Sequence, residues 1–351
     1  MRQLMDHLYT FDRRPVYAIY DVRNDFGFGC MDKVAIALDL GFTAEKSGVV
    51  HNVVPHPFRT VEEVEAFPWN ITLDGPHAKA ELNNIAQWVK NPEVHQGGGS
   101  FGPLTVAACI VGVEECTRMV IKKPKVLHAI LRKITDFMIL LAKEEEKLGA
   151  KSYWIAEPLA SLLSPRMCMK FSVPYIKEIY DAIHIPGVLH VCGNTDSHTS
   201  ALLASGAEAL SIDWCTNLPE CIAQAPEDIV IMGNISPMLL WKGTLEEVRA
   251  QTELLLEQTK NYKNFVMATG CQVPYMAPRE NVQLMVDLTK AYPIRSNEEF
   301  RQIARLANTL CDQGEEAFRD ACAAEQSSPE IAAAAEDVAR KHLAAQQKYA
   351  R

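Results

Sequence analysis

The segment G-V-L-H-V-C-G, from Gly187 to Gly193, decides both the fold and the chemistry that we expect of this chain. Its apolar residues follow Pro186 and end at a glycine, a pattern typical of a short buried strand that leads into a loop. His190 and Cys192 are two residues apart and would therefore project from the same face of that strand. An imidazole and a thiol together at a strand end make half of a zinc site.

Cys271 is the third candidate ligand. It follows another apolar run, Phe265 to Ala268, and Gly270 lets the backbone turn where that strand would end. Three protein ligands are typical of a catalytic zinc ion that keeps one position open. In the alternative interpretation, the cysteines are buried core thiols and His190 is a hydrogen-bonded core histidine. The spacing alone leaves both interpretations open.

The order of elements after Ser152 predicts the fold class. Apolar strands and amphipathic helices alternate with short connections, as in parallel βα units. Polar residues follow successive strands. In a (β/α)8 barrel the carboxyl ends of all strands meet at one mouth, so these residues would lie together there. An open doubly wound sheet is the alternative, but it gathers its ligands at one switch point. We therefore predict an α/β protein with a (β/α)8 TIM barrel, an N-terminal helical elaboration and a C-terminal helical tail.

The amino-acid composition changes after Pro293, where alanine-rich segments with many charged residues begin. We predict a catalytic barrel domain over residues 1–293 and a helical extension over residues 294–351. This extension would be an exposed appendage, pack on the barrel, join the subunits of a homo-oligomer or dock a partner.

Several other residues are candidates for the site because they follow a predicted strand or border a candidate ligand. The segment His95 to Pro103 is predicted to be a glycine-rich loop, which lets a backbone approach a ligand or simply makes a tight turn. It has no Gly-Lys-Ser/Thr of a phosphate loop. Core packing and solvated turns are the alternatives for all these residues. The candidates for substrate binding are Arg23, Ser100, Phe101, Asn234, Tyr275 and Met276, and those for catalytic proton handling or support of the metal are Glu157 and Asp213.

Composition narrows the range of partners and compartments. The net charge of -9 argues against nucleic acid and against an anionic membrane surface. Ten cysteines show no paired spacing, and the N-terminus has no apolar signal segment, so we expect reduced thiols in a cytoplasm. No apolar run approaches the roughly 20 residues that span a bilayer.

Six segments in a fixed order carry a family resemblance. They are S-F-G-P-L-T-V-A (Ser100 to Ala107), L-L-S-P (Leu162 to Pro165), L-H-V-C-G-N-T (Leu189 to Thr195), S-G-A-E-A-L-S-I-D (Ser205 to Asp213), M-G-N-I-S-P (Met232 to Pro237) and G-C-Q-V-P (Gly270 to Pro274). As a set they resemble the uroporphyrinogen decarboxylase superfamily, and within it the zinc-dependent, corrinoid-linked methyltransferases. The resemblance covers residues 95 to 292 well and the N-terminal third only loosely.

The resemblance implies a (β/α)8 barrel in which His190, Cys192 and Cys271 bind Zn²⁺. It also implies methylcobalamin or cob(I)alamin on a partner corrinoid protein, and a small-molecule thiol or another methylated compound as the second reactant. This chain lacks the D-x-H-x-x-G loop of cobalamin carriers, so the corrinoid protein would be a separate chain. In such a family member, zinc would hold an acceptor thiolate, or it would act as a Lewis acid on a methoxy compound.

Two departures bear on this resemblance. The superfamily's tetrapyrrole decarboxylases carry an R-Q-A-G-R-Y-type segment after the first strand, whereas here Arg23 lies between Asp21 and Asp25. A pocket that binds many substrate carboxylates should not be lined by two acids in this way, which argues against tetrapyrrole decarboxylation. A uroporphyrinogen decarboxylase-like lyase is therefore kept only as the alternative function. Trp214 stands where the related methyltransferases have a glutamate, which leaves Asp213, Cys215 or water as the fourth zinc ligand.

Overall fold

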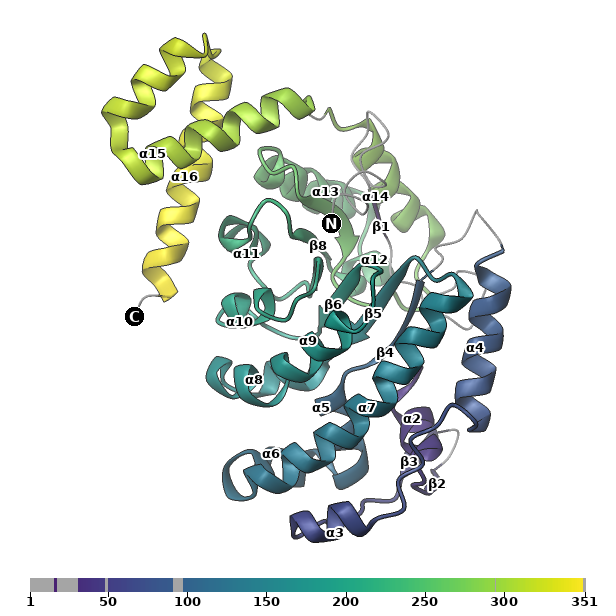
Figure 1. The fold of residues 1–351 in the computed structure, drawn as a ribbon. Helices are drawn as coiled ribbons and strands as arrows, with labels where there is room; N and C mark the ends of the chain where they lie inside the picture. The colour runs from purple at the N-terminus through teal and green to yellow at the C-terminus, as the bar shows by residue number, and fades with distance from the viewer. Residues whose placement is uncertain (1–15, 18–30, 48–49, 91–96, 294, 350–351) are drawn as a thin grey trace. The chain divides into compact units, whose positions relative to one another are not determined.

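The computed structural model describes residues 16–17, 31–47, 50–90, 97–293 and 295–349. They form two compact units. One unit lies within residues 20–211, and the other combines residues 212–351 with the N-terminal strand β1 (Val16–Tyr17). Both units alternate parallel strands with helices along the chain (Figure 1).

The first unit, residues 20–211, contains three consecutive parallel strands. β4 (Gly97–Phe101) pairs with β5 (Ser152–Ala156), which pairs in turn with β6 (Gly187–Val191). Met31 forms a parallel bridge to Ser100, so β4 has a second parallel neighbour on its other side.

The second unit brings the first strand of the chain beside the last. β8 (Val230–Ile235) pairs in parallel with β9 (Phe265–Thr269), and β9 pairs in parallel with β1. Apart from this closing pair, the strands of the parallel sheet, with β7 (Ala209–Ile212) among them, follow the order of the chain. Sequential parallel strands whose first and last members pair are the topology of a (β/α)8 barrel, so the predicted fold class is confirmed.

Helices separate the strands throughout the chain. Before β5, a small antiparallel hairpin that the sequence analysis does not predict joins the predicted helical elaboration. The elements of the first unit are α2 (Lys33–Asp39), β2 (Ala44–Ser47), β3 (Val50–Val53), α3 (Val61–Ala66), α4 (Pro76–Trp88), α5 (Pro103–Val111), α6 (Val113–Lys122), α7 (Pro124–Leu148), η1 (Pro158–Leu162), α8 (Pro165–Phe171), α9 (Val173–Asp181) and α10 (Thr199–Leu203). The second unit has α11 (Leu218–Gln224), α12 (Pro237–Lys242), α13 (Leu245–Thr259), α14 (Arg279–Ala291), α15 (Asn297–Ala324) and α16 (Pro329–Tyr349).

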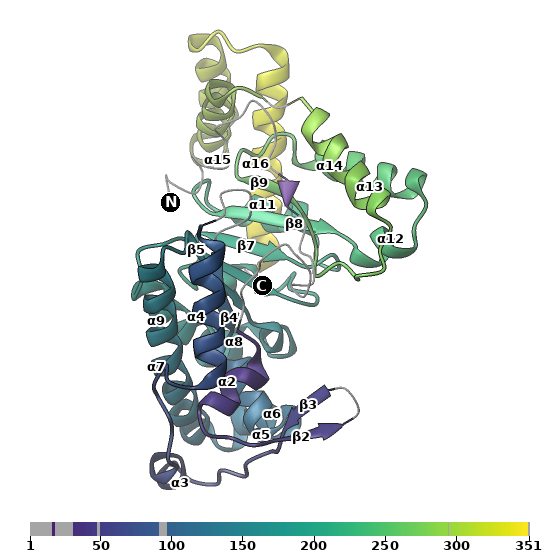
Figure 2. The ribbon, with the colours of Figure 1, turned by 90° about the vertical axis from the view of Figure 1, so that its right-hand side faces the viewer.

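The long helix α7 organises the packing of the first unit. Pro124 opens it, and Gly149 ends it with a left-handed backbone (φ 102°). Its apolar face is fully buried, and α4 and α9 both lie beside it (Figure 2). This packing also places α7 against β4, one of the strands whose carboxyl ends form the mouth of a barrel.

The glycine-rich segment after His95 is a strand and not the predicted loop. Residues 97–101 form β4, and two of its three glycines have no room for a side chain. A Cβ at Gly98 would overlap the Glu145 carboxylate, and one at Gly99 would overlap the backbone of Trp154. Tertiary packing therefore overrides the weak strand propensity of glycine here.

Glu145 is the buried acid against which β4 packs. Its side chain is fully buried, and neither of its oxygens accepts a hydrogen bond within the described part of the chain. Burial and the neighbouring Glu81 carboxyl raise the pKa of Glu145 well above its usual value. Burial also raises the pKa of Glu81 to about 7.

This pair of acids predicts that stability falls as the pH rises. The pKa of Glu81 is higher in the folded protein than in the unfolded chain, so its contribution is complete below pH 4.5 and is lost as the pH rises through about 7. We expect a loss of roughly 2–3 kcal/mol across this interval in denaturant titrations. Glu81→Gln should reduce this pH dependence without abolishing it, because the pKa values of Glu145 and Glu157 are also raised, whereas Glu144→Gln, a change in a surface ion pair, should leave it in place. An unchanged slope in Glu81→Gln would contradict the assignment.

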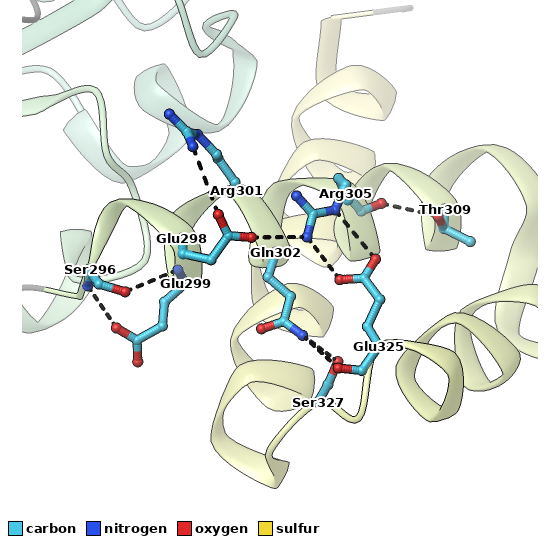
Figure 3. Close-up of polar contacts among 9 residues, drawn as sticks. All are labelled: Ser296, Glu298, Glu299, Arg301, Gln302, Arg305, Thr309, Glu325 and Ser327. Carbon is cyan, nitrogen blue, oxygen red and sulfur yellow. Dashed lines mark hydrogen bonds and ion pairs between the residues drawn. The ribbon is translucent and has the colours of Figure 1, made fainter.

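The C-terminal segment forms the predicted helices as a two-helix hairpin in which α15 packs against α16. Ser296 and Glu299 make a capping box at the start of α15. Arg305 donates to Glu298 and to Glu325, and Gln302 donates to the Ser327 hydroxyl, so the turn is fastened to the first half of α15 (Figure 3). The boundary between residues 293 and 294 stays a prediction.

Hydrophobic helices of membrane-spanning length do not occur among the described residues.

Candidate metal centre

His190 has one ring nitrogen anchored and the other directed at a thiol. All residues of β6 are buried, and only 8% of His190 is exposed. Its Nδ1 lies 3.1 Å from the Ser211 hydroxyl and 3.2 Å from the Ser211 carbonyl oxygen. Its Nε2 lies 3.2 Å from Cys192 Sγ. Because Nδ1 can donate its proton to the Ser211 carbonyl, Nε2 is left with a lone pair for a metal ion.

Cys271 lies just beyond β9, where Gly270 makes a close approach to another loop. The Gly270 N–H donates to the Ile235 carbonyl, at 2.8 Å. A Cβ at Gly270 would overlap the backbone of Trp214, so only glycine fits before the cysteine. The sequence predicts a glycine at position 270 for a turn of the backbone, and the structure adds close packing as a second reason for it.

One group among the described residues has the composition and spacing of a metal site. Candidate ligand atoms of His190, Cys192 and Cys271 all lie within 4.8 Å of one another. Zinc bonds of about 2.0–2.3 Å in a tetrahedron place neighbouring ligand atoms about 3.3–3.8 Å apart. The observed 3.2 Å between His190 and Cys192 is close to that spacing, so the donor set fits Zn²⁺.

Glu157 is buried and its carboxylate holds the start of α5. Oε2 accepts from the Leu104 N–H at 3.0 Å, and Oε1 accepts from the Thr105 N–H at 2.8 Å and from the Thr105 hydroxyl. Burial raises the pKa of Glu157 to about 7, although these three donors oppose the rise. The Glu157 N–H also donates to the His190 carbonyl, at 2.8 Å, so Glu157 is tied to the strand of the candidate ligands. Its role in proton handling stays a prediction.

Asp213 and Asn234 shape the loop after β7. The buried Asp213 carboxylate accepts from the Trp214 N–H at 2.6 Å. The Asn234 amide donates to the carbonyls of Asp213 and Thr216, at 3.0 and 2.8 Å. Both residues therefore support a strand-end loop, and their direct catalytic or substrate contacts stay predictions.

The remaining candidates differ in exposure. Ser100 is fully buried and accepts a hydrogen bond from the Tyr153 hydroxyl at 3.0 Å, whereas the ring of Phe101 lies under the Lys33 ammonium, at 4.6 Å. Tyr275 and Met276, in the loop after Cys271, are 77% and 76% exposed. Their exposure leaves both available to a ligand. Arg23 lies outside the described residues.

Ser211 is a residue of the site that the sequence analysis misses. It lies on β7, 21 residues after His190, and no local pattern links the two. Its only sequence signal is its position two residues before Asp213, on a strand predicted to end at the same mouth.

Ser211→Ala should weaken zinc binding. The variant loses the hydroxyl contact to Nδ1 but keeps the backbone carbonyl, so we expect about a tenfold loss of affinity, at the lower end of the effect of such partners. Competition with a chromogenic chelator would measure it. Ser205→Ala, at another buried serine whose hydroxyl donates to a carbonyl, should bind zinc as the wild type does. Equal affinities in the two variants would remove Ser211 from the site.

Comparison with known proteins places this geometry in context. A family model described as uroporphyrinogen decarboxylase (URO-D) matches residues 19–292. A methylcobamide:CoM methyltransferase of Methanosarcina mazei is 28% identical over 253 residues, which cover 69% of this chain and 71% of that protein. A methylated-thiol–coenzyme M methyltransferase of the same organism is 30% identical, over 58% of this chain and 55% of its own length.

Decarboxylases are almost as similar. The uroporphyrinogen decarboxylase of Anaeromyxobacter dehalogenans is 27% identical over 74% of this chain and 77% of its own. Among solved structures, a methyltransferase from Methanosarcina mazei superposes with a TM-score of 0.67 at 22% identity, over 81% of this chain and 96% of that one. This likeness supports the fold. Identity alone does not separate the two chemistries, so the choice between them depends on the site.

Proposed function

The chain belongs to the uroporphyrinogen decarboxylase family, and from this premise we propose that it is a zinc-dependent methyltransferase. It would exchange a methyl group between a corrinoid held by a partner protein and a small molecule, either a thiol or another methyl donor or acceptor. The group formed by His190, Cys192 and Cys271 is the observation that carries the proposal. Relatives named as methylcobamide:CoM methyltransferases support it.

The donor set suits this chemistry because two of its ligands are sulfur atoms and because it has only three protein ligands. Two thiols and one imidazole are soft and borderline ligands that select zinc over magnesium or calcium. When bound, zinc supplies a Lewis acid that deprotonates a thiol or polarises an ether oxygen. With three protein ligands, one position stays open for the reactant.

The chain's own residues would hold this site rigid. Ser211, beside His190 Nδ1, would fix the tautomer and ring orientation of His190. Glu157 holds the start of α5 and does not bind the metal in this proposal, because both its oxygens accept hydrogen bonds from Leu104 and Thr105. Such positioning, with the thiolate already formed, is what an in-line methyl transfer requires.

Metal analysis and a methyl-transfer assay test the proposal. The purified protein should contain close to one zinc per chain, and with methylcobalamin and a panel of thiols and methyl ethers it should show the absorbance change of corrinoid demethylation or methylation. A parallel assay with uroporphyrinogen tests the alternative. If the protein stays metal-free in the presence of zinc and turns over the tetrapyrrole, the proposed methyltransferase function is wrong and the protein is a decarboxylase.

A further inference from the structure

The pairing of β4, β5 and β6 places Phe101 and His190 on the same face of the sheet. Phe101 is paired with Ala156, and Ala156 is paired in turn with His190. Paired residues of neighbouring strands point to the same face, so all three residues share one face. Adjacent strands lie about 4.8 Å apart, which separates the Cα atoms of Phe101 and His190 by roughly 10 Å.

This shared face is the one that points away from the outer helices. A side chain at Gly98 would point toward α7, because its Cβ would overlap the Glu145 carboxylate. Phe101 lies three residues after Gly98 and therefore points to the opposite face. Phe101 and Ala156 are the last residues of their strands, and both are only half-buried. Ala156 carries only a methyl group, so no bulky side chain of β5 separates the Phe101 ring from the His190 imidazole.

Lys33 brings a positive charge to this end of the strands. Met31 pairs in parallel with Ser100, and Lys33 follows two residues later, beside the end of β4. The side chain of Lys33 is half-buried, and its ammonium lies 4.6 Å from the centre of the Phe101 ring. The ring stabilises the cation through its π face and accepts no N–H, so the ammonium keeps its donors for a ligand.

Local interactions do not account for the charge of Lys33. The preceding carboxylate, that of Asp32, caps α2 by accepting from the Val34 N–H at 2.8 Å. Within the described ranges of the chain, no carboxylate forms an ion pair with the Lys33 ammonium. Lys33 is also the first residue of α2, and a cation is unfavourable in the first turn of a helix. An anionic ligand would supply the missing partner.

We propose that Lys33 determines substrate specificity by binding an anionic group, a carboxylate or a sulfonate, of the small molecule that reacts at the metal centre. The inference rests on the methyltransferase function and adds the charge of the substrate to it. The anionic group would accept from the ammonium above Phe101 while the reactive sulfur lies near His190, two strands away. An uncharged thiol of the same length would leave the ammonium unpaired.

Two thiols of nearly the same shape test this assignment. 3-Mercaptopropionate carries a carboxylate, and 3-mercaptopropionamide is its uncharged counterpart. In calorimetric titrations of the full-length zinc protein, the carboxylate should bind at least about tenfold more tightly than the amide. 2-Mercaptoethanesulfonate distinguishes the two anions, and tighter binding of either anion than of the amide supports the proposal. Salt at about 0.5 M should reduce the preference because it screens the charges.

Lys33→Met separates the charge from the packing, because methionine keeps an unbranched apolar stem over the ring. The affinity for the carboxylate should fall at least about tenfold, whereas that for the amide should stay within about twofold of the wild type. Lys33→Arg should retain the preference to within about threefold. Lys170→Met is the matched control, since Lys170 also lies over a ring, that of Phe171 at 5.1 Å, but in the last turn of α8. It should bind both thiols as the wild type does.

Two results would overturn the proposal: equal binding of the acid and the amide by the wild type, or a preference that persists in Lys33→Met. A loss of binding in this variant should not reflect unfolding, because the change removes a cation from the first turn of a helix. Urea titrations should show it to be as stable as the wild type.

The outcome is separable from that of the methyltransferase proposal. A protein that contains zinc and transfers methyl groups, but binds the acid and the amide equally, would retain the proposed function and lose only this specificity. A protein that prefers the acid through Lys33 but transfers no methyl group would retain the anion-binding residue and lose the proposed function.

Discussion

Cys192→Ser and Cys271→Ser should each yield protein that contains little zinc and transfers methyl groups at least about 100-fold more slowly than the wild type. Loss of a partner that merely orients a zinc ligand costs about 10–100-fold in affinity or activity, and loss of a ligand should cost more. Serine is close in size to cysteine but is a much poorer zinc ligand at neutral pH. Mass spectrometry of the metal and the methylcobalamin assay would measure the two losses.

The pair of variants tests whether the two cysteines share one ion. Cys192 follows β6 and Cys271 follows β9, and two unrelated core thiols would give unrelated effects. If they share an ion, the double variant should lose no more than either single variant, because groups that act as one unit are not additive. Cys322→Ser, at an intermediate exposure like that of Cys271, is the control and should keep its zinc. Full zinc content in either single variant would contradict the shared site.

The sequence predicts the local half of this site because the relevant pattern is local. The two-residue spacing of His190 and Cys192 on a buried strand is enough to place both on one face, and β6 confirms the strand. The barrel fold can also be predicted from the sequence, since apolar strands that alternate with helices allow few topologies. Cys271 is a candidate because it follows another apolar run and Gly270, and the family resemblance then supports it as the third ligand.

What the sequence does not show depends on contacts between distant residues. The residues of β4 look like a loop because glycine has a low strand propensity, and the buried Glu145 that excludes side chains there is 47 residues beyond Gly98. The parts played by Ser211 and Asn234 also depend on distant contacts. Ser211 contacts the His190 ring, and the Asn234 amide donates hydrogen bonds to carbonyls of the preceding strand-end loop. Polar residues at strand ends thus predict the place of a site better than they predict each residue's part in it.

Glu157 illustrates this difference and leads to a large effect on stability. Its carboxylate accepts three hydrogen bonds from Leu104 and Thr105, at the helix start where backbone N–H groups have no partner within the helix. Glu157→Gln should change the free energy of unfolding at pH 8 by no more than about 1 kcal/mol, because its amide nitrogen cannot accept one of these bonds but the variant also avoids burying an ionised carboxylate, the cost of which raises the pKa of Glu157 to about 7. Glu157→Ala leaves all three donors buried without this partner and should cost about 3 kcal/mol or more. Urea titrations would measure both.

The relation between stability and zinc binding then decides what Glu157 does. If it acts by anchoring α5 to the strand of His190, Glu157→Ala should lose stability yet bind zinc within about threefold of the wild type once folded. Glu253→Gln, in an exposed ion pair with Arg249, is the control and should change stability by no more than about 0.5 kcal/mol. A Glu157→Ala protein that is as stable as this control but slower in methyl transfer would show that Glu157 takes part in the chemistry and not in holding the fold. That result would support the proton-handling role that its position at a strand end predicts.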